Sequence, residues 1–214
     1  MAETYKIGTT DVTTYLTHLQ IVGGNIGVPP VLQDDYSIPG RTGVVAATPW
    51  FGPRVLTLGG VVTGATRVAM QENLKSLGSL VLKGGDTYNL YRTLDTAGTP
   101  THVASARYLG GLDVVEPLSN KAVRVAVDIA LLDGFFYDTA FTTVGTVSGT
   151  QIVSIDGDAP TQNVDLTYSI GAESQRITNS AYTGLTRLML KPGNNTLVVT
   201  GGGSVVLKYK AAFL

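Results

Sequence analysis

Histidine is the side chain that most often carries acid–base or zinc chemistry, and this sequence holds two, His18 and His102. Neither has a second histidine or a carboxylate at the spacing of a zinc site or a catalytic triad. The chain contains no cysteine, which excludes a thiolate zinc site, a cysteine nucleophile and disulfide bonds. We therefore expect ordinary structural or surface roles for both histidines, no catalytic residue and no metal.

Two acidic groups could supply oxygen ligands for calcium, Asp34-Asp35 and Asp156-Gly157-Asp158. Neither matches the twelve-residue calcium-binding loop, so we expect both to be solvated. The segment Gly23-Gly24-Asn25-Ile26-Gly27 lacks the Lys-Ser/Thr pair of a phosphate-binding loop, which favours a turn or bulge. The sequence thus predicts no cofactor and no enzymatic activity.

The aromatic pair Trp50-Phe51 lies between Pro49 and Gly52-Pro53, so at least one ring is expected in a loop. Such a ring could stack on a sugar, anchor a subunit contact or pack within its own chain. We favour packing over a ligand role, with subunit contact as the most plausible functional use.

The composition is that of a folded, nearly neutral protein. Of 214 residues, 43% are hydrophobic and 14% are charged, against about 25% charged in an average domain. The 15 basic and 16 acidic side chains give a net charge of −1 and form no basic cluster, so stable binding to nucleic acid or to a membrane is not expected. Neither a signal peptide nor a membrane-spanning stretch is expected from the sequence.

Alternation of apolar residues with small or polar ones, the pattern of a strand with one buried face, dominates the sequence. It is clearest from Lys121 to Leu132. Shorter runs occur at Arg54–Val62, Thr87–Arg92, His102–Val115, Asn163–Ile170, Thr186–Lys191, Thr196–Thr200 and Ser204–Lys210. The glycines at 201–203 separate the last two runs, which predicts a final hairpin.

One segment has helical spacing instead. From Thr66 to Leu82 the apolar residues Met70, Leu74, Leu77 and Val81 recur on one face, Thr66 can cap the start, and Gly84-Gly85 ends the run. The predicted fold class is therefore mainly β with one α-helix. A domain boundary is expected near Asp133–Asp138, which gives an N-terminal β domain with the helix (residues 1–133) and a C-terminal β-sandwich (residues 134–214).

Three motifs follow one another in the first domain: Val28-Pro29-Pro30, Asp35-Tyr36-Ser37-Ile38-Pro39-Gly40-Arg41-Thr42-Gly43 and Pro49-Trp50-Phe51-Gly52-Pro53-Arg54. Together with the helix, the alternating strand and an aromatic hinge, this order resembles the distal tail (Dit) proteins of siphophages, the long-tailed, non-contractile phages. The stretch Leu188–Leu214 looks like the closing strands of that family's second domain. The resemblance covers nearly the whole chain.

The resemblance implies a structural virion protein of the tail tip, or baseplate, made in the host cytoplasm. In that family the N-terminal domain forms a hexameric ring around a DNA channel, and a galectin-like β-sandwich lies outside it. The ring joins the tail tube on one face to the baseplate hub, or tail-associated protein, on the other. With about eighty residues, the second domain leaves no room for the carbohydrate-binding insertions of some relatives.

For such a ring we hypothesise that Arg41, Trp50, Phe51 and Arg54 contribute to the subunit interface. A channel that passes DNA should not hold it, so we expect little positive charge in the lumen. Two alternatives stay open. One is a tail-tube subunit, and the other is a carbohydrate-binding β-sandwich protein for host attachment.

Overall fold

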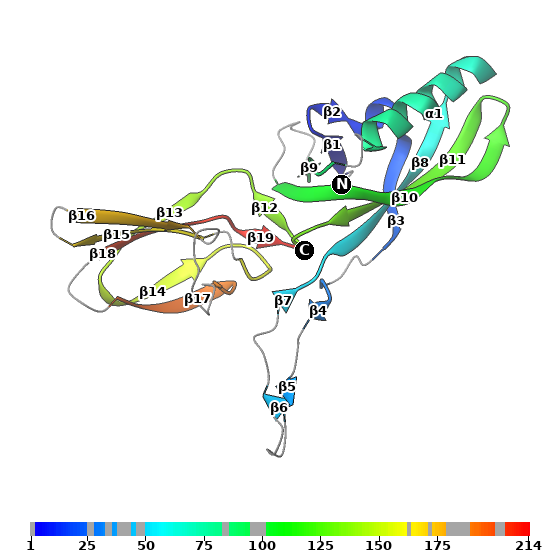
Figure 1. Cartoon of the computed structure of the whole chain (residues 1–214). Helices are drawn as coiled ribbons and strands as arrows, with labels where there is room; N and C mark the ends of the chain where they lie inside the picture. The colour runs from blue at the N-terminus through cyan, green and yellow to red at the C-terminus, as the bar shows by residue number, and fades with distance from the viewer. Residues whose placement is uncertain are drawn as a thin grey trace. The chain divides into compact units, whose positions relative to one another are not determined.

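The computed structural model describes residues 3–24, 28–32, 36–37, 44–45, 50–82, 86–94, 102–161, 164–170, 173–178, 189–199 and 204–214. Its contacts divide the chain into two compact units, Met1–Phe135 and Phe136–Leu214 (Figure 1). The sequence placed the division between residues 133 and 134. The described chain is mainly β with one α-helix, which confirms the predicted fold class.

The first unit is built on an antiparallel sheet. Its strands lie in the order β2 (Thr10–Asp11), β1 (Thr4–Ile7), β9 (Tyr88–Thr93), β10 (His102–Ser119), β11 (Ala122–Leu131), β8 (Arg54–Thr63) and β3 (Thr17–Gly24). A 3-10 turn, η1 (Val12–Thr14), separates β2 from β3. Strands β10 and β11 form a long hairpin, drawn in green in Figure 1.

The alternation predicted for the longest strand is present in β11. Val123, Val125 and Val127 are buried, whereas Arg124, between the first two, is exposed. The strand pairs with β8 without a break, from Ala122 opposite Thr63 to Leu131 opposite Arg54. One face of β11 therefore supplies much of the core of the first unit.

The helix α1 (Arg67–Leu82) begins where the sequence places its cap. The Ala69 N–H donates to Thr66 Oγ1 at 3.1 Å, and the buried residues Met70, Leu77 and Val81 repeat at helical spacing. The helix contacts β8 and β10. A Cβ at Gly78 would lie 3.3 Å from the Leu112 side chain of β10, so the glycine permits this close approach.

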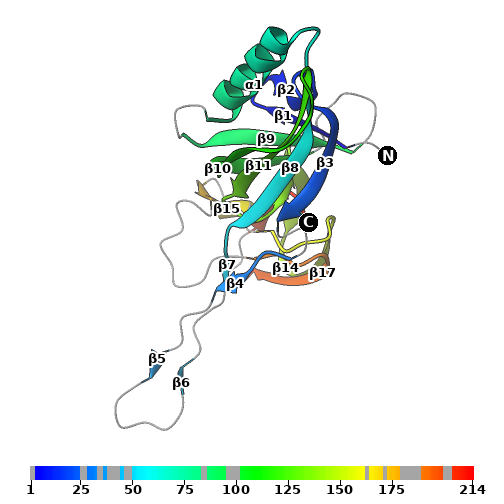
Figure 2. The same ribbon diagram turned by 90° about the vertical axis from the view of Figure 1, so that its right-hand side faces the viewer.

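Between β3 and β8 the chain forms two short antiparallel pairs, and we call the described residues here (28–32, 36–37, 44–45 and 50–53) the arm. The pair nearer the sheet is β4 (Val31–Leu32) with β7 (Trp50–Phe51), and the farther pair is β5 (Tyr36–Ser37) with β6 (Val44–Val45). Figure 2 shows the β4–β7 pair next to the start of β8.

The second unit contains two layers of strands. One layer is the sheet β13 (Thr142–Val147), β18 (Ser204–Tyr209), β15 (Val164–Ile170) and β16 (Glu173–Thr178), and the other is the pair β14 (Gly149–Ile155) and β17 (Gly193–Val199). A further pair, β12 (Phe136–Asp138) and β19 (Ala212–Phe213), joins the two ends of the unit.

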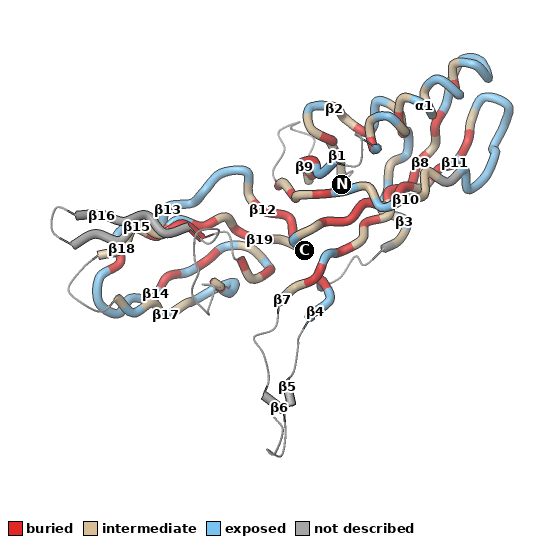
Figure 3. Tube along the Cα trace, viewed as in Figure 1, coloured by how far each residue is buried: buried red, intermediate tan, exposed pale blue. Residues whose placement is uncertain are grey.

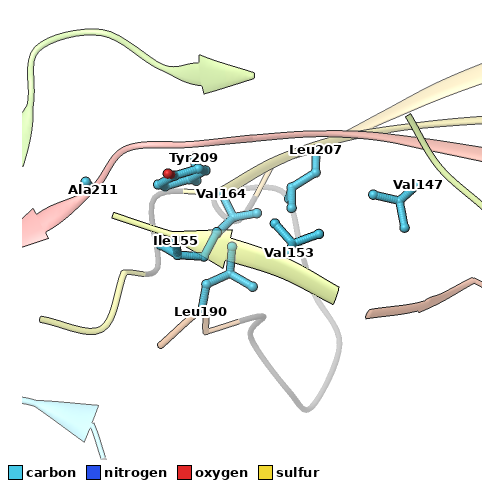
Figure 4. Close-up of a cluster of buried hydrophobic side chains, with 8 residues drawn as sticks. All are labelled: Val147, Val153, Ile155, Val164, Leu190, Leu207, Tyr209 and Ala211. Atoms are coloured by element: carbon cyan, nitrogen blue, oxygen red, sulfur yellow. The ribbon is translucent and has the colours of Figure 1, made fainter. Parts of the chain in front are cut away.

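One buried cluster fills the space between these layers (Figure 4). It combines Leu207 and Tyr209 of β18 with Val153 and Ile155 of β14, which is the packing of a two-layer β-sandwich. The predicted final hairpin is wrong, because β17 pairs with β14 and β18 pairs with β13 and β15. Two strands separated by glycines have the same sequence pattern whether they pair with each other or lie in different layers.

Candidate assembly surfaces

The four residues predicted at a subunit interface lie on or near the arm. Arg41 lies outside the described residues. Trp50 is in β7, where its backbone pairs with Leu32 of β4. Phe51 follows it in β7, and Arg54 begins β8. No observation tests their role at an interface, which stays a prediction.

The Phe51 ring packs within its own unit. It meets the Phe135 ring edge-on, with a centroid separation of 4.9 Å and an interplanar angle of 78°. Such edge-to-face pairs contribute about 0.5–1.5 kcal/mol beyond the area they bury. The side chain remains half-exposed, so packing in the chain leaves part of it available for contact.

Arg54 is an interior residue of the isolated chain, with 3% of its surface exposed. Its charge acts on the hydroxyl of Tyr5, which donates to Glu3 Oε2 at 2.6 Å. Burial raises the pKa of Tyr5, the Glu3 carboxylate adds to that rise, and the Arg92 and Arg54 guanidiniums oppose it. Arg54 and Arg92 are both buried, whereas Glu3 is partly exposed.

The histidines occupy two different environments. His102 is buried in β10, and Arg92 Nη2 lies 3.4 Å from its Nδ1. His18 is exposed in β3 with φ 53°, a left-handed conformation inside a strand. The two residues belong to separate strands and make no common site.

Of the acidic groups, Asp34-Asp35 lies outside the described residues. Asp158 Oδ1 accepts the Leu214 N–H at 2.8 Å, and the Asp156 N–H donates to the Tyr209 hydroxyl at 3.1 Å. Within the described ranges, no three His, Cys, Asp or Glu side chains group so as to hold a metal ion. Nor is any helix there long and apolar enough to cross a membrane.

The sheet of the first unit ends in two different edges. Strand β3 pairs with β8, and no described strand of this unit pairs with its other side. On the opposite side of the sheet, β9 pairs with β10 only over His102–Ala106. Beyond Ala106, β10 pairs with β11 on one side, and no described strand of the unit pairs with it on the other side. We call residues 107–119 of β10 the hairpin edge and strand β3 the β3 edge.

Exposed apolar side chains form a group on the hairpin edge, whereas the β3 edge has a single one. The hairpin edge exposes Leu109, Val114, Val115 and Leu118, and Val115 is 58% exposed. Figure 3 shows the end of the β10–β11 hairpin mostly in the colour of exposed residues. On the β3 edge, Val22 is exposed. Large apolar side chains grouped on one strand mark an interaction surface, whereas single scattered ones do not.

Both edges also have features that hinder pairing with an arbitrary strand of another chain. The register of β10 shifts at Gly110 and Gly111, which have φ 151° and 75°, and Pro117 has no N–H to donate. In β3 the register shifts between Thr17 and Gln20, around His18. Bulges and proline are the usual protection of edge strands. These features disfavour pairing with an arbitrary strand, and the grouped apolar side chains make the hairpin edge a candidate interaction surface.

These edges could not be located from the sequence. Periodicity shows that residues 102–115 form a strand, but it does not show which neighbour ends at Ala106. The available signal was Gly110-Gly111 inside a strand pattern, followed by Pro117, since both are typical of bulges and edges.

No protein-family model matches the chain, and no curated protein matches it either. Among solved structures, the Dit protein (gp 19.1) of SPP1 superposes with a TM-score of 0.59 over 98% of this chain and 99% of that one, at 15% identity. It is described as a paradigm of the hub adsorption apparatus in phages that infect Gram-positive bacteria. The fold is that of SPP1 Dit. The Dit fold thus extends through both units, as the resemblance in sequence implied.

Two structures of the phage P2 baseplate in its activated conformation also align over nearly the whole chain. The one with Ca has a TM-score of 0.44 at 10% identity, covering 99% of this chain and 98% of that one. The one with Sr has a TM-score of 0.41. Scores below 0.5 do not establish a shared fold, so the Dit fold rests on the SPP1 protein.

Proposed function

We propose that this chain is a structural, non-enzymatic subunit of a phage tail tip, a distal tail protein of the siphophage type. Copies of it assemble into a ring, six in number as in the Dit family, that connects the tail tube to the baseplate hub and lets DNA pass. The likeness of both units to SPP1 Dit is the observation that carries this proposal.

The two edges of the first unit support ring formation. The β3 edge and the hairpin edge are different surfaces, so a contact between them is heterologous and repeats from copy to copy. Heterologous contacts close into a ring when the rotation between copies divides a full turn. Pairing of the exposed apolar residues on the two edges would also remove them from water in the assembly.

The first test is the mass of the purified protein, measured by light scattering after size-exclusion chromatography, with negative-stain images of the main peak. We expect discrete rings near six times 22.4 kDa. If the protein stays monomeric both alone and when mixed with its tail-tube protein, ring formation is refuted.

A substitution on the hairpin edge tests the contact itself. Val115→Lys puts a charge on an exposed strand position, so the fold should persist while the ring dissociates into monomers. Ile152→Lys is the matched control, because Ile152 is 70% exposed on β14 of the second unit. Rings that survive Val115→Lys would remove this edge from the interface.

Arg41, Trp50, Phe51 and Arg54 are proposed to support the same interface from the arm. The half-exposed ring of Phe51 and the position of β7 on the arm support this. Arg54 is buried in the single chain, so its contribution would be to hold the start of β8 and thereby the arm.

A tail-tube subunit is the second candidate, and the arm favours it, because tube subunits stack their rings through a long connection of this kind. Open-ended tubes of the purified protein would support the tube, and discrete rings support the adaptor. The carbohydrate-binding alternative predicts a signal on a glycan array, whereas the adaptor predicts none.

A further inference from the structure

The two faces of the sheet in the first unit differ in what covers them. One face of β8 and β11 is buried, with Val62, Val125 and Val127 at most 2% exposed. Helix α1 contacts β8 and β10 through its buried side, so the helix lies over this face. A close approach of the two layers is visible at Gly78 of α1, where a Cβ would lie 3.3 Å from the Leu112 side chain.

The opposite face carries small and polar side chains. Side chains alternate along a strand, so Ala126 and Asp128 of β11 point away from α1, and Thr57 of β8 lies opposite Asp128. Thr57 Oγ1 donates to Asp128 Oδ1 at 2.6 Å. All three side chains are partly exposed in the single chain. We call the side of the sheet that carries Thr57, Val61, Arg124, Ala126 and Asp128 the open face.

Four charged side chains of the open face balance one another. Arg124 Nη1 lies 3.4 Å from Glu116 Oε2, and both side chains are 55% exposed. Asp128 adds a carboxylate, and Arg107, which pairs with Ala130 on the same face, adds a guanidinium. Retention of a DNA backbone requires an excess of basic side chains, which these four do not provide.

A contact between the β3 edge and the hairpin edge determines how such a sheet can close. Strands β10, β11, β8 and β3 of successive copies then form a continuous wall, with one face toward the ring axis and one away from it. The axis side of a closed wall has the smaller circumference. Because α1 adds a second layer about 10 Å from the sheet, the helix is accommodated more easily on the outer side.

We propose that the open face lines the channel of the ring and that α1 lies on its outer side. DNA then passes over Thr57, Ala126 and Asp128, on a surface that is already partly hydrated in the single chain. The assignment rests on the proposed function and deepens it, because it names the side chains that meet the DNA.

The test compares how far two positions lie from the ring axis, using pulsed electron spin resonance between spin labels in assembled rings. The chain has no cysteine, so Ala126→Cys on the open face and Gln71→Cys on α1 each give one label per copy. Equivalent labels lie at one height by symmetry, and in a ring of six the distance between neighbours equals the distance to the axis. We expect the distance for Ala126→Cys to be shorter by about 10 Å, the spacing of packed layers.

Two further variants keep the comparison decisive. Arg124→Cys, at a more exposed position of the open face, replaces Ala126→Cys if that variant fails to fold or to assemble. Glu72→Cys, also exposed on α1, is the control and should reproduce the longer distance. Rings in which the open-face distance equals or exceeds the α1 distance would overturn the channel assignment and leave the ring itself standing. A wild-type protein that forms no ring, alone or with its tail-tube protein, would refute both, and light scattering identifies that case.

Discussion

Two tyrosines of the first unit bury their hydroxyls in opposite circumstances. Tyr88 is 7% exposed, and its hydroxyl has no hydrogen-bond partner among the described residues. Burial raises the pKa of Tyr88, with a smaller contribution from Tyr108. Tyr5 instead donates to Glu3 at 2.6 Å. The hydroxyl of Tyr88 therefore destabilises the folded state, whereas the hydroxyl of Tyr5 stabilises it.

Removing each hydroxyl should change stability in opposite directions. We expect Tyr88→Phe to raise the free energy of unfolding by about 1 kcal/mol, because a buried hydroxyl without a partner costs about that much. Tyr5→Phe should lower it by about 1 kcal/mol, through loss of a bond to a carboxylate. Urea denaturation of the first unit measures both. Equal effects of one sign would contradict this account.

Asp138 makes stability depend on pH. Burial raises the pKa of its carboxyl, Asp156 adds to the rise, and the Ala211 N–H and Lys210 oppose it. The folded state thus binds the proton more tightly than the unfolded chain. This stabilisation is complete below the ordinary value of 3.8 and is lost as the pH rises through the folded pKa.

Asp138→Asn removes the ionised form and keeps an oxygen that can accept from Ala211. We expect the variant to unfold at a higher temperature than the wild type at pH values above the folded pKa of Asp138, because burial disfavours the carboxylate there. The difference should shrink as the pH falls toward 3.8 and below. Calorimetry across this range checks it, and a difference that grows in acid would show that the pKa is lowered instead.

At the scale of elements, α1 depends on its first turn. Thr66 caps the helix, and the first turn has no acidic residue to add a favourable charge. Thr66→Ala should therefore cost about 1 kcal/mol of stability. Thr66→Ser keeps the hydroxyl and is the control, expected to lose much less. If both variants lose the same amount, the hydroxyl is not what holds the helix.

Local patterns predicted elements well and partners poorly. The spacing of Met70, Leu77 and Val81 defined the helix, and the alternation in residues 121–132 defined β11, because each pattern lies within one segment. Pairing is decided between segments. The runs at 196–200 and 204–210 were correctly expected as strands, yet β17 and β18 lie in different layers. Sequence patterns carry no information on that choice.

The candidate surfaces likewise depend on neighbours that the sequence pattern does not determine. Val115 and Val125 are both valines in paired strands, but Val125 is fully buried and Val115 is 58% exposed. Val115 lies in the part of β10 that β9 does not reach, because β9 pairs with β10 only up to Ala106. The sequence placed at least one ring of Trp50-Phe51 in a loop, whereas both residues form the short strand β7. The contact of Phe51 with Phe135, more than eighty positions away, required the fold.

At the scale of the whole molecule, charge bears on the passage of DNA that we propose for the assembled ring. The chain has 15 basic and 16 acidic side chains, and a ring of copies repeats that balance. Binding to a DNA backbone comes mainly from basic side chains that displace counterions, and it weakens steeply as salt rises. A nearly neutral ring should let DNA pass without retaining it.

Assembled protein mixed with double-stranded DNA should therefore show no binding even at low ionic strength. Fluorescence anisotropy of a labelled duplex, followed as salt is raised, measures this, with a basic protein of known affinity as the positive control. Binding that falls about a thousandfold between 50 and 200 mM salt would mean that about six phosphates are neutralised. That result would require the few basic side chains to be gathered on the channel wall, and the expectation of a weakly charged lumen would then be wrong.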